Sequence, residues 1–68
     1  MENRIRELRN DRGFTQQQLA ELVNVSSRTI ISLENRQYNP SVLLAYRLAF
    51  VFGCAIEQVF LFGEEDTP

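Results

Sequence analysis

The chain has 68 residues, a formal net charge of −2, no histidine and one cysteine. This length predicts one small domain whose core is only marginally stabilising, so added burial through a dimer is expected. With no histidine, a lone Cys54 and carboxylates at no recognisable ligand spacing, we expect no enzyme, metal site or cofactor. No apolar run is long enough for a membrane span and the N-terminus does not resemble a signal peptide, which favours a cytoplasmic chain without membrane contact.

The first predicted helix covers residues 4–12. Asn3 can cap its start, and Gly13 is a typical stop. Ile5 and Leu8 form its buried face. Arg4 and Arg6 are expected on the solvated side.

A second helix start is strongly specified at Thr15. The Thr15 side chain can accept from the backbone N–H of Gln18, whose own side chain can bond back to the Thr15 N–H, which is a capping box. Leu19, Leu22 and Val23 have the spacing of a buried stripe. Asn24 tolerates the left-handed backbone that ends a helix.

Ser26 can cap a third helix only about two residues after the second helix ends. The small Ala20 lets two helices joined by so short a turn cross closely. Ile30 and Leu33 then point toward the second helix. The residues left facing outward are Ser27, Arg28, Ile31, Ser32 and Asn35.

Asn39 and Pro40 force an extended step before a fourth helix over about 42–52, capped by Ser41 and ended by Gly53. Its predicted core face consists of Val42, Ala45, Leu48, Ala49 and Phe52. A second apolar edge contains Leu43, Tyr46 and Phe50. Two interpretations of this edge stay open: a subunit interface, or burial under the C-terminal segment.

A short fifth helix is expected over about 56–60, followed by an apolar end, Phe60-Leu61-Phe62. Charge is unevenly distributed: residues 1–47 hold all seven arginines against five acids, whereas residues 48–68 hold four acids and no base. We therefore expect a mildly basic first part and an acidic, flexible tail over 63–68.

The pattern resembles the helix-turn-helix proteins of the phage repressor and Cro type, the XRE family. The residues that carry the resemblance are Thr15-Gln16, Leu19-Ala20, Val25-Ser26, Thr29-Ile30, Glu34-Asn35 and Tyr38-Asn39-Pro40-Ser41. It implies an all-α, five-helix lambda-repressor-like domain over residues 1–62, with the helix-turn-helix at helices two and three. The family commonly has glycine at Asn24 and at Arg36. Because arginine is strained at positive φ, we expect Asn35 to take the left-handed position or the loop to shift.

The resemblance implies a regulator that binds double-stranded DNA at a near-palindromic operator as a homodimer, most simply a repressor that blocks a promoter. Arg28 is the main candidate for reading a base. The predicted base-reading residues are Ser27, Arg28, Thr29 and Ser32. The predicted phosphate contacts are Gln16, Gln17, Asn35, Arg36, Gln37 and Tyr38.

By the same resemblance, Arg9 pairs with Glu34 and ties the first helix to the end of the third. The predicted dimer interface consists of Leu43, Phe50, Val59, Phe60, Leu61 and Phe62. A regulatory partner protein is a further candidate partner. Two alternatives stay open: an antitoxin-like module that grips a partner protein, and a protein-interaction module in which DNA binding is secondary.

Overall fold

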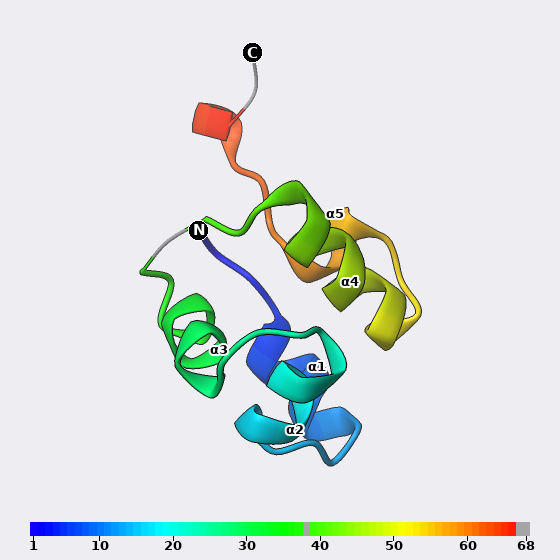
Figure 1. The fold of residues 1–68 in the computed structure, drawn as a ribbon. Coiled ribbons are helices and arrows are strands. Elements are labelled where there is room, and N and C mark those ends of the chain that lie inside the picture. Colours follow the sequence, from blue (N-terminus) through cyan, green and yellow to red (C-terminus); the bar gives the residue numbers. More distant parts are fainter. Residues whose placement is uncertain (38, 67–68) are drawn as a thin grey trace.

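A computed structural model describes residues 1–37 and 39–66, and these fold into five short α-helices (Figure 1). The helices are α1 (Ile5–Asp11), α2 (Gln16–Leu22), α3 (Ser27–Glu34), α4 (Val42–Phe52) and α5 (Ile56–Val59), and a 3₁₀ turn, η1 (Glu64–Asp66), follows. The expected all-α, five-helix fold is confirmed. Within the two described ranges, no helix is long and apolar enough to cross a membrane.

Side-chain caps start α2, α3 and α4 where the sequence predicts. Thr15 Oγ1 accepts from the Gln18 N–H at 3.0 Å, and Gln18 Oε1 accepts from the Thr15 N–H at 2.8 Å. Ser26 Oγ and Ser41 Oγ accept from the third residues of α3 and α4. Each cap satisfies a backbone N–H that lacks a partner within its helix, so the start of each helix is fixed locally.

The N-terminal segment joins α1 to the end of the chain. Asn3 Oδ1 accepts from the Ile5 N–H at 3.1 Å, and Asn3 Nδ2 donates to the Leu33 carbonyl at 2.8 Å. Asn3 also forms an isolated antiparallel bridge with Phe60. The start of α1, the end of α3 and the segment after α5 are therefore held together by one asparagine and its backbone.

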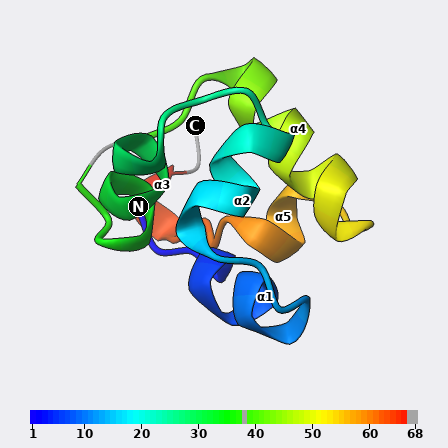
Figure 2. The same cartoon turned by 60° about the horizontal axis from the view of Figure 1, so that its bottom comes forward.

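The core lies where the five helices meet, with α2 beside α3 and α4 beside α5 (Figures 1 and 2). Its buried apolar residues are Ile5, Leu19, Ala20, Val23, Ile30, Leu33, Leu44, Ala45, Leu48, Ala49, Phe52, Val59 and Phe60. Two residues predicted for the core, Leu22 and Val42, are exposed instead, and Leu44, outside the predicted core face of α4, is buried. The α4 sequence is apolar nearly all round, so its periodicity does not identify the face that packs inward.

Candidate nucleic-acid interface

One face of α3 is free of the core. The inward positions Ile30, Leu33 and Glu34 are buried, whereas Ser27 and Arg28 are exposed at the first turn. These two are predicted base readers, and the structure brings them together on the outer surface. The other two, Thr29 and Ser32, are half-buried. Thr29 Oγ1 lies 3.1 Å from Ser26 Oγ, so this hydroxyl is engaged at the helix cap.

The carboxylate of Glu34 fixes the position of α3 relative to α1 and α2. It accepts from Arg9 Nε at 2.7 Å, from Arg6 Nε at 3.2 Å and from Gln16 Nε2 at 3.2 Å. The Glu34 side chain is 0% exposed. Arg9, from α1, was expected there. Arg6 is exposed, as expected, but it also donates to this carboxylate. Gln16, expected to hold a phosphate, donates its amide to the same group.

Glu34 stays charged in this buried position. Burial raises the pKa of its carboxyl, but the hydrogen bonds from Arg9, Gln16 and Arg6 and the charge of Arg9 lower it by more, so the pKa lies below its ordinary value. The desolvation of a buried carboxylate is offset only when charged and neutral donors surround it in good hydrogen-bonding geometry. The network therefore holds the three N-terminal helices in one arrangement.

The chain reverses at Arg36 directly after α3. Arg36 itself has φ 61°, whereas Asn35 has φ −85°. Neither of the two expected alternatives, a left-handed Asn35 or a shifted loop, is found. The Gln37 N–H donates to the Ser32 carbonyl at 3.0 Å and the Arg36 N–H to that of Leu33 at 3.0 Å. These two bonds close a Schellman-type helix end, whose left-handed position falls on the residue after the C-cap, which is Arg36.

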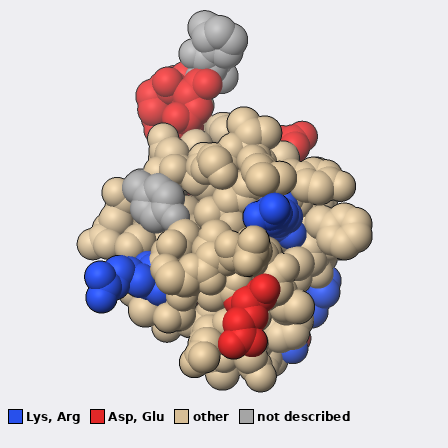
Figure 3. All heavy atoms as spheres, in the orientation of Figure 1, with Lys and Arg blue, Asp and Glu red and all other residues tan. Residues whose placement is uncertain are grey.

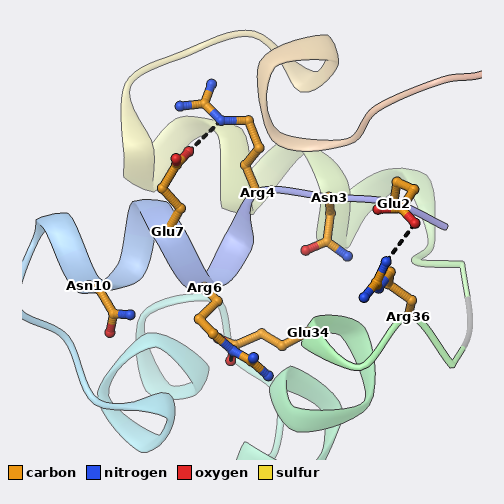
Figure 4. Close-up of a pocket in the computed structure, with 8 residues that line it drawn as sticks. All are labelled: Glu2, Asn3, Arg4, Arg6, Glu7, Asn10, Glu34 and Arg36. Carbon is orange, nitrogen blue, oxygen red and sulfur yellow. Dashed lines mark hydrogen bonds and ion pairs between the residues drawn. The ribbon is translucent and has the colours of Figure 1, made fainter.

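Arg36 Nη1 lies 2.6 Å from Glu2 Oε1 in an exposed ion pair. The pair lies in an open cleft between the N-terminal segment, α1 and α3 (Figure 4). The cleft also holds the Arg4–Glu7 pair, with Arg4 Nε 2.6 Å from Glu7 Oε2. No signal in the sequence pointed to Glu2, because its partner lies 34 positions away.

The remaining predicted phosphate contacts flank the two ends of the helix-turn-helix. Gln17 is exposed at the start of α2, and Asn35, Arg36 and Gln37 are exposed after α3. Tyr38 lies outside the described residues. The carboxylates of η1 gather at the end of the molecule opposite α2 (Figure 3), so the acidic segment lies away from the start of that helix.

The helix-turn-helix family model matches residues 5–59. The chain belongs to this family, in its XRE-type branch. An uncharacterised HTH-type transcriptional regulator of Archaeoglobus fulgidus is 48% identical over 66 residues, covering 97% of this chain and 94% of that protein. The competence pilus inhibition repressor of Acinetobacter baylyi is 42% identical over 62 residues, covering 88% of this chain and 54% of the repressor. The crystal structure of the restriction-modification controller protein C.AhdI from Aeromonas hydrophila matches with a TM-score of 0.76 at 30% identity, covering 84% of this chain and 86% of that one.

This XRE-type protein is a DNA-binding transcriptional regulator, and it carries an exposed apolar surface on α4. Leu43 is 54% exposed and Phe50 is 75% exposed, so burial under the C-terminal segment is wrong for both. Val42 and Tyr46 extend the same surface, and the Tyr46 and Phe50 rings lie 6.3 Å apart. We call these four residues, Val42, Leu43, Tyr46 and Phe50, the α4 stripe.

The apolar end of the chain divides between core and surface. Val59 and Phe60, both predicted for a dimer interface, are buried within the protomer and cannot contact a second copy in this conformation. They are buried because the bridge between Asn3 and Phe60 fixes this segment over the core. Leu61 and Phe62 stay exposed, and Phe62 lines one apolar pocket together with Val42. The α4 stripe is therefore continuous with the end of the chain.

Proposed function

We propose that the protein binds a near-palindromic DNA site as a homodimer and represses transcription by occupying a promoter. The observation that carries this proposal is the outer face of α3. It presents an exposed Arg28 beside Ser27, while Glu34 on the opposite side is hydrogen-bonded to side chains of α1 and α2. A helix held in this way can enter the major groove without rearrangement.

Arg28 reads the base sequence in this proposal. Its guanidinium matches the O6 and N7 acceptors of guanine, a contact that contributes about 1–3 kcal/mol of discrimination. Ser27 and Ser32 contact neighbouring base edges, and the hydroxyl of Thr29 does so only if it leaves Ser26. Gln17, Asn35, Arg36 and Gln37 contact phosphates and set the register. Gln16 acts through Glu34 by keeping the start of α2 in place, and its own phosphate contact uses the N-terminal backbone of α2.

The α4 stripe and Phe62 form the two-fold contact in this proposal. A monomer seldom exposes a contiguous apolar surface of this kind. The protomer measures 34 × 22 × 19 Å, so two adjacent copies can present their α3 helices about 34 Å apart, one turn of DNA. Because the net charge is −2, phosphate neutralisation adds little to the DNA affinity of one protomer. A dimer compensates for this by doubling the contacts of α3.

Selection of bound sequences from random duplexes, with the mass of the protein and of the complex measured in parallel, tests the proposal. We expect a dimer, a site with two-fold symmetry, and a loss of roughly tenfold or more in affinity for Arg28→Ala. Arg4→Ala is the matched control, since it removes the same charge from an exposed pair at the start of α1. If Arg28→Ala and Arg4→Ala bind the selected DNA equally well, α3 does not read sequence.

The exposed α4 stripe also favours a second candidate function, that of a module that binds a partner protein, as an antitoxin does. In that case the stripe is covered by another protein rather than by a second copy. A wild-type chain that stays monomeric at high concentration and binds DNA only when co-expressed with a neighbouring gene's product would support this candidate. A dimer of the chain alone would contradict it.

A further inference from the structure

Ile31 is an apolar residue in the middle of the polar face of α3. Its neighbours Ile30 and Leu33 are fully buried, yet Ile31 is 40% exposed. On a helix, residues three and four apart are neighbours, so Ile31 adjoins both Ser27 and Arg28 and precedes Asn35 by one turn. It therefore lies among the side chains that the proposed function assigns to the DNA contact.

The fold accounts for only part of this side chain, because 40% of Ile31 remains exposed. A β-branched residue lowers helix propensity slightly compared with alanine or glutamine, and the exposed part of its apolar surface contributes nothing to the core while it faces water. That surface can still be buried when α3 enters the groove. Because χ1 of isoleucine is already nearly fixed in a helix, burial costs little side-chain entropy.

We propose that Ile31 contacts the C5-methyl group of a thymine next to the base read by Arg28. The inference rests on the proposed function and adds a residue that sets base preference. In the major groove thymine alone presents a methyl group, whereas the other bases present hydrogen-bond donors and acceptors and, for cytosine, a small C5–H beside its amino group. An isoleucine packed against those polar edges displaces water and leaves the donors and acceptors of the base without hydrogen bonds, which lowers affinity. Ile31 thus favours thymine through the methyl contact and disfavours other bases wherever it covers their polar edges.

Replacement of thymine by deoxyuridine tests the contact, because this change removes the methyl group and leaves every hydrogen-bonding atom in place. In the duplex selected by the wild-type protein, each thymine is replaced singly and affinity is measured. We expect one position per half-site at which deoxyuridine weakens wild-type binding roughly fourfold, the value of one buried methyl group. Ile31→Ala is expected to bind the thymine and deoxyuridine duplexes equally.

Two controls separate this inference from the proposed function. Leu22→Ala removes an exposed apolar side chain from α2 and should keep the wild-type ratio between thymine and deoxyuridine. If the ratio for Ile31→Ala equals that of the wild type, or if no thymine in the site is sensitive, the Ile31 contact is wrong. In those cases a weakened Arg28→Ala still supports the proposed function. If Arg28→Ala also binds normally, both proposals fail.

Discussion

Glu34 connects three helices through its carboxylate, and the contribution of its charge to stability can be tested by varying the pH. Its folded pKa is lowered, so on acidification the unfolded chain takes up a proton first, at about pH 4.3. The stabilisation from this lowered pKa is therefore complete well above that pH and is lost as the pH falls through the folded pKa. At neutral pH, removing the charge also leaves the nearly buried Arg9 without its counter-ion.

We expect Glu34→Gln to lower the free energy of unfolding at pH 7 by roughly 3 kcal/mol, the typical cost of breaking a buried ion pair. The difference from wild type should shrink as the pH falls below about 4.3. Thermal melts between pH 7 and 3 measure both quantities. Glu7→Gln, in the exposed pair with Arg4, should follow the wild-type curve closely. A constant gap between Glu34→Gln and wild type at all pH values would count against a charged, paired Glu34.

Only part of this network could be predicted from the sequence. The Arg9–Glu34 pair followed from resemblance to the family. Arg6 and Gln16 approach the same carboxylate because α1 and α2 cross α3 at particular angles, and residue spacing within each helix contains no such information. Arg6 is exposed, as expected for a solvated arginine, but its contact with Glu34 could not be predicted for this reason.

At the scale of single elements, the end of α3 combines strain with a proposed DNA contact. Arg36 has a left-handed backbone that costs a residue with Cβ about 1 kcal/mol or more. Its side chain gains an exposed ion pair with Glu2, which stabilises the fold by less than the backbone strain costs. In the proposed function the same guanidinium contacts a phosphate. Glu2 therefore competes with that phosphate for Arg36. Stability and DNA affinity are therefore expected to respond to this position with opposite signs.

Arg36→Gly should raise the melting temperature by several degrees, since glycine takes positive φ without strain. The same variant should weaken DNA binding and reduce the slope of log affinity against log salt by about one. Glu2→Gln is the matched control: it breaks the ion pair but keeps the strained backbone, so stability should hardly change and DNA binding should not weaken. Arg36→Gly melting below wild type would show that the loop depends on the arginine side chain.

The helix boundaries were largely predictable, whereas the packed faces were less so. Thr15, Ser26 and Ser41 cap their helices through local bonds that the sequence determines by itself. The exposure of Leu22 and Val42 depends on which neighbour covers each face. In a two-turn helix such as α2, or in the almost wholly apolar α4, several faces are equally consistent with the pattern.

For the whole molecule, the proposed dimer can be tested at Phe50. A two-fold interface brings the same surface of both copies together, so one substitution acts twice. Phe50→Glu places two carboxylates in that contact, where like charges are unfavourable by several kcal/mol. Because Phe50 is 75% exposed in the protomer, the substitution should leave the fold intact. We therefore expect a folded monomer in sedimentation equilibrium at concentrations where the wild type is a dimer.

The DNA affinities of the same variant separate dimerisation from sequence reading. Phe50→Glu should lose most of its affinity for the full symmetric site, because the second α3 no longer binds as part of one complex. Its affinity for an isolated half-site should stay close to that of the wild-type protomer, since Arg28 and Ser27 are unchanged. Leu22→Glu adds the same charge to an exposed apolar position on α2 and should remain dimeric. A dimeric Phe50→Glu protein would place the two-fold contact elsewhere. A monomeric variant that still prefers the full site would show that two protomers assemble on the DNA without the α4 contact.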